Sequence, residues 1–552
     1  MDQEFDDRPR FPVPEEVVFT SVLGSSGRQT SEALTGDPDA AAAESHRPDT
    51  HDRPMHRTLI PILGLGLTVA CGSPPQTASL AIHDVTVIDP LSRQVLPDHS
   101  VFVSEGRIVG VEPAGGAAFL ATDSLDGSGR FVIPGLMDMH VHLFRDARVA
   151  RPTLNLLLAN GITGFREMAS DCWDATVEHA FCTDSLRELT RDVAAGGRTT
   201  PRPLAMSSLP INGVSQRGGL PEGAPEFLAP GTADDGRTLA QWLNARQIDV
   251  VKVYNSVPRD AYFALLDEAT GLDMEVSGHL PLSVSVVEAS NAGHRTIEHA
   301  RDLPVACGSY SDTYRKVMAR VVAGDDGVNG PSAFERIRAT LDAFDESVCA
   351  AVLTTLAANG TYLVPTHGTR EMDYLAGDSA YRANDRLRYV LPPIREGWEA
   401  DLDRTAGASD DLVEMYGEFY ALGVRLSGMA HATGVKVMAG TDSNDTMIIP
   451  GFALHDELAR FVESGMSPMD ALRTATATPA EYLDRSGDLG TISVGAVADL
   501  LLLNADPLAD IANTLSIEAV LVGGRVQDRA TLDELLVSVE AAVSAWDGGA
   551  DP

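Results

Sequence analysis

Residues 131–143 read Phe131-Val-Ile-Pro-Gly-Leu-Met-Asp-Met-His-Val-His-Leu143. The segment begins with apolar, β-prone residues, turns at Pro134-Gly135, and ends in His140-Val-His142. Residues two apart in a strand point to the same side of a sheet. The two imidazoles are therefore predicted to lie side by side at the end of a strand, as a metal site requires. Two histidines on a solvated edge would fit the same spacing, so the rest of the chain has to discriminate between these interpretations.

The composition is that of a large globular protein. The chain has 552 residues, of which 44% are hydrophobic and 22% charged, enough for a sizeable core and more than one domain. Its formal net charge of −37 argues against non-specific binding to nucleic acid, and none is expected as a partner. Lysine is scarce: Lys252, Lys316 and Lys436 are the three in the chain, and arginine supplies the other basic side chains.

The first 78 residues are predicted to lie outside the catalytic fold. Residues 1–54 are rich in Asp, Glu, Pro, Ser and Ala, and are expected to be disordered or a mis-annotated leader. Residues 55–71 resemble a bacterial lipoprotein signal peptide, with a short basic region, an apolar run and Cys71 as the lipidation site. The protein would then start at Met55, residues 72–78 would be a tether, and Cys71 would be the one membrane anchor. The expected location is the cell envelope, in the periplasm or as an outer-membrane lipoprotein. A buried hydrophobic helix is the alternative.

Export would also suit the other four cysteines. Cys172 and Cys182 lie close in sequence, and Cys307 and Cys349 form a second candidate pair. An even number of cysteines outside the cytoplasm suggests disulfides, although the sequence does not fix the pairing and free buried thiols remain an alternative.

The two ends of the chain beyond residue 78 are rich in strand patterns. Residues 79–89 alternate, and residues 100–111 predict a hairpin that turns at Glu105-Gly106. Strand patterns return at 490–503 and 517–526. We therefore expect a small composite β-sandwich domain built from residues 79–133 and 490–530, followed by a C-terminal tail at 531–552.

The middle of the chain alternates strands with helices. Eight strand candidates are followed by helical stretches, which predicts an α/β fold with a (β/α)8 TIM-like barrel over residues 134–489. The strands are expected at 136–142, 161–167, 204–208, 249–254, 274–279, 295–299, 362–366 and 435–442. Residues 371–423 form a mainly helical insertion, placed after the seventh strand where a lid would be.

Polar side chains stand at the ends of five of these strands. They are His140, His142, Lys252, His279, His299 and Asp442. Active sites of such barrels lie at the C-terminal ends of the strands, so all six are predicted to face one mouth. Six unrelated surface or core residues would be the alternative explanation, and so regular a placement argues against it.

With these motifs in place, the chain resembles the amidohydrolase superfamily, and more narrowly its imidazolonepropionase-like and prolidase-like metal-dependent hydrolases. The matching motifs are residues 133–142, Asp249-Val-Val-Lys-Val-Tyr254, Gly278-His279, Ile297-Glu-His299 and Ala439-Gly-Thr-Asp442. The resemblance extends over roughly residues 78–530.

The resemblance implies a binuclear metal site. His140 and His142 would bind the more buried metal, His279 and His299 the second, and Asp442 would ligate the first metal and act as the general base. Lys252, carboxylated by CO2, would bridge both. Lysine can lose its proton when buried and then form a carbamate, whereas arginine cannot; a lysine in an ordinary salt bridge is the alternative. The metals are expected to be Zn, with Fe, Mn or Co also suited to this set.

The implied reaction is hydrolysis of a C–N amide bond in a small-molecule substrate, of the dipeptide or N-acyl amino acid type. Two metals would hold a bridging hydroxide, and Asp442 would move its proton to the leaving amine. Tyr254 could hydrogen-bond the developing oxyanion, or be a barrel-wall aromatic. His367 and Arg166 are candidate substrate contacts, although an ion pair would equally explain Arg166.

Two other functions fit the same sequence. A mononuclear cyclic-amide hydrolase (imidazolonepropionase-like) or deaminase would leave Lys252 without a role. Such deaminases usually place a glutamate three residues after the fifth-strand histidine, where this chain has Leu282. A catalytically dead barrel acting as a binding protein would show a missing ligand, and none is missing. The oligomeric state, including a homo-oligomer, is left open by the sequence.

Overall fold

The computed structural model describes residues 75–172 and 180–546. The predicted leader, the predicted signal peptide with Cys71, and residues 72–74 of the predicted tether lie outside the described residues, as do the last six residues of the predicted tail. Among the described helices, none combines the length and the hydropathy that crossing a lipid bilayer would need.

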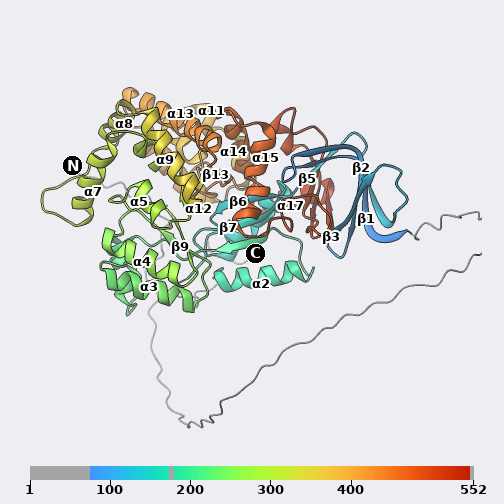
Figure 1. Cartoon of the computed structure of the whole chain (residues 1–552), viewed down its shortest axis with the longest axis horizontal. Coiled ribbons are helices and arrows are strands. Elements are labelled where there is room, and N and C mark those ends of the chain that lie inside the picture. Colours follow the sequence, from blue (N-terminus) through green and yellow to red (C-terminus); the bar gives the residue numbers. More distant parts are fainter. Residues whose placement is uncertain (1–74, 173–179, 547–552) are drawn as a thin grey trace, which may run out of the picture. The chain divides into compact units, whose positions relative to one another are not determined.

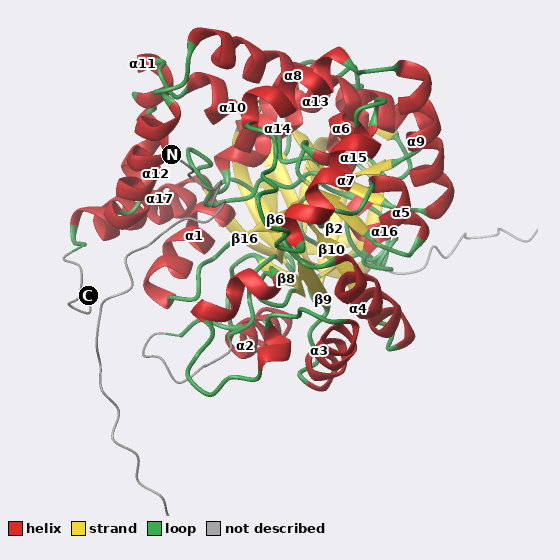
Figure 2. Ribbon diagram, turned by 90° about the vertical axis from the view of Figure 1, so that its left-hand side faces the viewer, coloured by secondary structure: helices red, strands yellow, loops and turns green. Residues whose placement is uncertain are grey.

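Eight parallel strands and the helices around them form the larger part of the described chain. Figures 1 and 2 show the helices gathered around these strands. The strands are β6 (Leu136–Val141), β7 (Ile162–Glu167), β8 (Arg202–Met206), β9 (Val250–Val253), β10 (Glu275–Gly278), β11 (Thr296–Glu298), β12 (Tyr362–Val364) and β13 (Lys436–Val437). Each begins within or close to a predicted segment; β8 has the predicted five residues, and the other seven strands are shorter than predicted.

The strands follow one another in chain order but do not form one continuous ladder. A three-stranded sheet (β6-β7-β8) and a five-stranded sheet (β9 to β13) meet at two seams, where isolated bridges join Ser207 to Val250 and Val141 to Ser443. The prediction of a (β/α)8 TIM-like barrel is confirmed as a TIM-barrel-like α/β fold, in which the described strands form two sheets and not one continuous ladder. The second seam stays bonded although β13 is short, since Asp442 N donates to His140 O at 2.8 Å and Met139 N to Ala439 O at 3.0 Å.

Helices follow the strands and cover their outer side (Figure 2). They are α1 (Ala147–Ala159), α2 (Thr183–Ala194), α3 (Ala233–Ala245), α4 (Arg259–Gly271), α5 (Val286–Asn291), α6 (Asp302–Ala306), α7 (Ser311–Val322), α8 (Ala333–Asp342), α9 (Glu346–Asn359), α14 (Phe452–Glu463), α15 (Pro468–Thr474) and α16 (Ala477–Tyr482). One continuous cluster of buried apolar side chains fills the space between these helices and the strands.

The helical insertion after β12 contains α10 (Gly368–Leu375), α11 (Ser379–Arg382), α12 (Pro392–Thr405) and α13 (Asp410–Thr433). A separate apolar cluster around Ile394, Trp398 and Leu402 anchors α12. The last of these helices, α13, ends at Gly434 in the left-handed conformation and leads directly into β13.

Both ends of the described chain contribute to one eight-stranded sheet. Its strands are β1 (Gln76–Asp89), β2 (Gln94–Ser104), β3 (Arg107–Pro113), β4 (Phe119–Asp126), β5 (Phe131–Pro134), β14 (Leu500–Leu503), β15 (Ile517–Val522) and β16 (Arg525–Asp528). The β2–β3 hairpin turns at Glu105 (φ 50°) and Gly106 (φ 76°), as predicted. The hydrogen-bonded ladder is continuous, and Arg107 in β3 also bridges to Val497 just before β14, so the sheet curls back on itself around its own core. Because β1 begins at Gln76, part of the predicted tether is strand.

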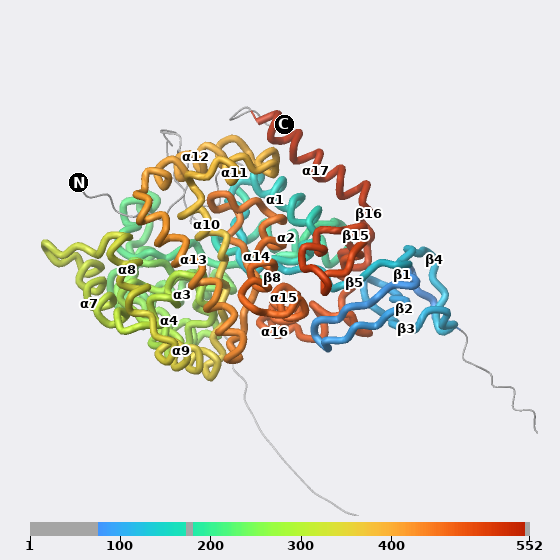
Figure 3. Tube along the Cα trace, turned by 90° about the horizontal axis from the view of Figure 1, so that it is seen from above, coloured from blue at the N-terminus to red at the C-terminus, as the bar shows by residue number. Residues whose placement is uncertain are grey.

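The C-terminal segment predicted as a tail is instead a helix, α17 (Arg529–Ser544). Leu532 and Val539 lie seven residues apart on one face, and both are buried. Figure 3 shows α17 alongside α1, where Val539 packs against Leu156. The prediction of a tail was wrong because the apolar residues of this segment have helical spacing. Their face is buried only through packing against neighbouring elements, which the sequence of the segment does not reveal.

The four described cysteines form two disulfides. Cys172 pairs with Cys182, and Cys307 pairs with Cys349. The second bond joins the end of α6 to α9, and both of its cysteines are fully buried. Of the pairings that the sequence left open, the structure contains the two between sequence neighbours.

Candidate metal centre

The six strand-end residues come from five strands and gather at one mouth of the barrel. His140 is the fifth residue of β6 and Lys252 the third of β9, while His279 and His299 directly follow β10 and β11. Asp442 stands beyond β13, where its backbone pairs with that of His140. This is the C-terminal end of the strands, the side that carries active sites in this architecture.

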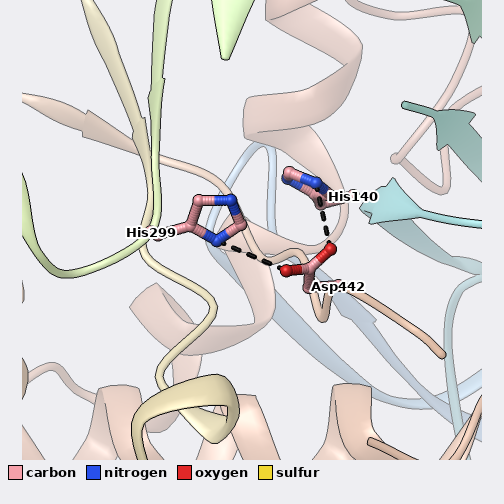
Figure 4. Close-up of side chains that lie close together, drawn as sticks. All are labelled: His140, His299 and Asp442. Atoms are coloured by element: carbon pink, nitrogen blue, oxygen red, sulfur yellow. Dashed lines mark ion pairs between the residues drawn. The ribbon is translucent and has the colours of Figure 1, made fainter. Parts of the chain in front are cut away.

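The side chains of His140 and His299 point toward the Asp442 carboxylate (Figure 4). Its Oδ1 lies 2.9 Å from His142 Nε2 and 3.3 Å from His140 Nε2, and its Oδ2 lies 3.5 Å from His299 Nδ1. Among the described residues, His140, His299 and Asp442 have ligand atoms that all fall within 4.8 Å of one another. Such a group of imidazole and carboxylate donors has the chemistry of a transition-metal site.

Lys252 lies directly against this group. Its Nζ is 3.0 Å from His140 Nε2, and its side chain is almost fully buried. Burial lowers the pKa of Lys252 to about 8, although Glu298 and Asp442 partly counteract this shift. A lysine with this pKa has an appreciable neutral fraction near neutral pH, which is the form that reacts with CO2.

His279 completes the cluster on the other side. Its ring lies 4.5 Å from that of His299, centroid to centroid, and stacks on Tyr254 at 3.8 Å. Its Nδ1 is 3.0 Å from Asn255 Oδ1, which Arg301 also contacts. Burial, with the positive charge of Arg301 in second place, holds the pKa of His279 well below its usual value, so this imidazole is neutral and able to act as a ligand.

Backbone conformation aims the ligands at the centre. His299 (φ 66°) and Asp442 (φ 64°) are both left-handed, as is Thr366 (φ 44°), whose Oγ1 lies 2.8 Å from His299 Nδ1. Non-glycine residues seldom adopt this conformation, and such strain clusters at functional sites. Gly440 allows the segment before Asp442 to lie close to the strand that carries His140, since a Cβ at position 440 would lie 2.9 Å from His140 Cβ.

The charges of the two central carboxylates are set by their neighbours. Burial alone would raise the pKa of Asp442, but His140 and His299 outweigh it and hold the pKa well below its usual value. Burial likewise opposes ionisation of Glu298, and Arg166 together with His140 reverses the effect, so its pKa is also lowered. Both carboxylates are therefore ionised at neutral pH.

The two predicted substrate contacts do not face the mouth. Arg166 is fully buried and donates to Glu298 Oε1 at 2.7 Å. His367 is also buried, with Nδ1 2.8 Å from Glu457 Oε1 and Nε2 3.0 Å from Ser427 Oγ. The predicted direct contact with substrate is corrected for both, because each side chain is held inside the protein by a carboxylate that the sequence pattern could not assign to it.

The new assignment of His367 predicts a loss of stability on mutation. Replacing His367 by alanine leaves Glu457 buried with one partner fewer, and is expected to lower the free energy of unfolding by about 3 kcal/mol. The Michaelis constant of whatever substrate is turned over should stay within about twofold, since no ligand contact is lost. Urea denaturation alongside steady-state kinetics checks this, and a large rise in KM with unchanged stability would restore His367 as a substrate contact.

Several residues of the centre carried no predicted role. Glu298 stands between Ile297 and His299 in a motif noted for its histidine, and Thr366 and Asn255 each follow a strand. The signal available was position alone, since each lies next to a candidate ligand. Their function depends on partners from other strands, which spacing does not identify.

Comparison with known proteins supports the fold and the family of this chain. A model of the Amidohydrolase family matches residues 253–526, a span that contains His279, His299 and Asp442. The chain belongs to the amidohydrolase superfamily. Solved structures share the fold: a bottromycin amidohydrolase is 21% identical, with 86% of this chain and 93% of that one covered and a TM-score of 0.64. A Xaa-Pro dipeptidase is 18% identical, with 81% and 99% covered and a TM-score of 0.56.

Among curated proteins, an adenine deaminase of Rubrobacter xylanophilus is 25% identical over 456 residues. The match covers 81% of this amidohydrolase-superfamily chain and 58% of the relative, so the chain spans less than two thirds of that protein's length. The comparison is therefore informative about the shared barrel and does not carry the activity of the longer protein over to this chain.

Proposed function

We propose that this protein is a metal-dependent hydrolase that cleaves a C–N amide bond in a small molecule of the dipeptide or N-acyl amino acid type. The observation that carries the proposal is a series of short contacts at the mouth. Lys252 Nζ lies 3.0 Å from His140 Nε2, and the Nε2 atoms of His140 and His142 lie 3.3 Å and 2.9 Å from Asp442 Oδ1. A buried lysine among imidazoles has no evident structural purpose, whereas a carbamate there would supply two further oxygen ligands.

The residues present fit a pair of divalent metals. Two of the histidines have one ring nitrogen next to a fixed partner: His140 Nδ1 at Glu298 and His279 Nδ1 at Asn255. A ligating histidine is usually held in this way through the nitrogen that does not bind the metal. His140, His142 and Asp442 would hold one ion and His279 and His299 the other, with carboxylated Lys252 shared between them. Nitrogen and oxygen donors suit Zn, and also Fe, Mn or Co.

The side chains of the protein would supply proton transfer and stabilisation of the developing negative charge. Bound metals of this kind polarise a carbonyl oxygen and lower the pKa of water. Asp442, ionised and partly exposed, is placed to take a proton from the attacking water and to deliver it to the leaving amine. Tyr254, half-buried and stacked on His279, would donate a hydrogen bond from its hydroxyl to the oxygen on which negative charge develops.

A deaminase is the second candidate, and the similarity to adenine deaminases favours it. The fifth-strand sequence His279-Leu-Pro-Leu282 has no glutamate to serve as the proton carrier that such enzymes usually use, and a one-metal site would leave Lys252 unexplained. The amide hydrolase therefore accounts for more of the residues at the mouth.

We also propose that the protein works outside the cytoplasm. Two disulfides are typical of exported proteins and rare in cytoplasmic ones, which supports the proposal. The candidate lipid anchor, Cys71, belongs to the segment that the structure does not describe.

The test is a metal count followed by a substrate panel. The full chain, purified with bicarbonate and loaded with Zn, Mn or Co, should contain about two metal ions per chain by mass spectrometry. It should then release amine from some member of a panel of dipeptides and N-acyl amino acids. Ammonia release from adenine with one metal bound would favour the deaminase, and a chain that binds no metal and turns over nothing would favour a binding protein.

A further inference from the structure

A charged pair lies inside the barrel beneath the metal centre. Arg166 on β7 and Glu298 on β11 are both completely buried. The interior of such barrels is normally filled with layers of branched apolar side chains. An arginine and a glutamate at this depth therefore need a physical reason.

Stability does not provide that reason. Removing two charges from water costs several kcal/mol per ion, and replacing a buried ion pair by apolar side chains of similar size is often neutral or stabilising. A pair kept for stability alone would be a poor choice at this position. The contacts of Glu298 instead point toward the ligands.

The two oxygens of Glu298 have different tasks. Oε1 accepts from Arg166 Nη2 at 2.7 Å and from the Thr296 hydroxyl. Oε2 lies 2.8 Å from His140 Nδ1. The glutamate therefore reaches across the barrel from β11 to β6, two strands that are not neighbours in either sheet.

Arg166 holds this carboxylate in place and also hydrogen-bonds to β6, the strand that carries His140. Its Nε donates to Met139 O at 2.6 Å, one residue before His140, and its Nη1 donates to Tyr482 Oη at 3.1 Å. If the glutamate rotated away, the buried Arg166 guanidinium would lose its carboxylate partner. As a result, His140 Nδ1 always faces the same acceptor, and Nε2 faces Lys252 at 3.0 Å and Asp442 at 3.3 Å.

We propose that Glu298, held by Arg166, is a positioning residue that keeps His140 as the tautomer protonated on Nδ1 and so presents Nε2 to the metal. The inference rests on the proposed function, since it assigns a role toward the metal. A carboxylate on the far nitrogen fixes the ring and makes the other nitrogen a better donor. Arg166, predicted as a substrate contact, thereby acts through Glu298 on the ligand set.

The test measures metal affinity and stability separately on the full chain. Zinc affinity is measured by chelator competition, with thermal unfolding of the metal-free protein as the second readout. Glu298→Gln is expected to weaken zinc binding about 10-fold, and the apolar double variant Glu298→Leu/Arg166→Met about 100-fold, while the double variant stays folded. With Co as the metal, the visible ligand-field spectrum of both variants should also change, because the His140 ring is released.

Asp499→Asn is the matched control. Asp499 is a buried carboxylate paired with Arg202 at 3.4 Å, and it lies by the strand starts, away from the mouth. This variant should lose stability but keep wild-type zinc affinity and the wild-type Co spectrum. If Asp499→Asn weakens zinc binding as much as Glu298→Gln does, or if the folded double variant binds zinc like the wild type, the positioning role is wrong. A wild-type chain that binds no zinc would instead overturn the metal centre, and this role with it.

Discussion

Replacing Lys252 by alanine is expected to reduce the metal content from about two ions per chain to one or fewer and to lower amide hydrolysis by about 10³-fold. The physical reason is that the lysine contributes in two ways. It would supply the nitrogen of the carbamate ligand, and its Nζ lies 3.0 Å from His140 Nε2, in direct contact with the candidate ligands. Without it, the anionic carbamate that would be shared between the two ions is lost, so the second ion would be held by fewer ligands.

The measurement is metal analysis with turnover of the best substrate from the panel, in the presence of bicarbonate. Incubation with ¹³C-labelled bicarbonate should give a carbamate carbon signal in the wild type that the variant lacks. Lys436→Ala is the matched control, because Lys436 is a partly exposed lysine that pairs with Glu481 at 2.7 Å on the outside of the barrel. A Lys252→Ala protein that keeps two metals and full activity would remove the bridging role and favour the one-metal reading of the site.

Replacing Asp442 by asparagine is expected to lower kcat by about 10²–10⁴-fold, the range for loss of a general acid–base group, with a smaller change in KM. Asparagine keeps the size of the side chain and can still occupy the space between His140 and His142. It cannot accept a proton from water or return one to an amine. The left-handed backbone at this position, φ 64°, is tolerated by asparagine, so the fold should be preserved.

Steady-state kinetics and a metal count on Asp442→Asn check this expectation. Asp533→Asn serves as its control, since Asp533 is an exposed partner of Arg529 on α17 and should behave like the wild type. Activity of Asp442→Asn within about tenfold of the wild type would mean that another group moves the proton. In that case Tyr254 and His142, the other partly exposed groups at the mouth, become the candidates.

The sequence predicted those features that depend on neighbouring residues in the chain, and missed those that depend on partners far away in sequence. The barrel strands and the six polar residues at their ends were predicted because strand alternation and strand termination are local properties of the chain. Parallel strands that share a direction bring their ends to one mouth, so a list of strand ends is already a list of neighbours. The hairpin at Glu105-Gly106 was predictable for the same reason, since a two-residue turn is encoded by its own residues.

Partners across the barrel were beyond the reach of these signals. Arg166 was predicted to meet a substrate because an arginine at a strand end can face the mouth. It points into the interior instead, because Glu298 on a non-adjacent strand offers it a carboxylate. His367 was misassigned in the same way, since Glu457 lies 90 residues further along the chain. Similarly, the last helix was predicted as a tail because its apolar face is buried by contacts with distant segments such as α1.

Residue type and spacing alone therefore specify the architecture and the chemical character of this amidohydrolase-superfamily centre: imidazoles, one lysine and one carboxylate at the ends of parallel strands. Which ring nitrogen faces the centre, which charged side chains are buried beneath it, and which cysteines pair all depend on three-dimensional packing. Burial makes an unpaired charge or hydrogen-bonding group costly, so each such group takes the partner that folding brings within reach, however distant that partner is in sequence.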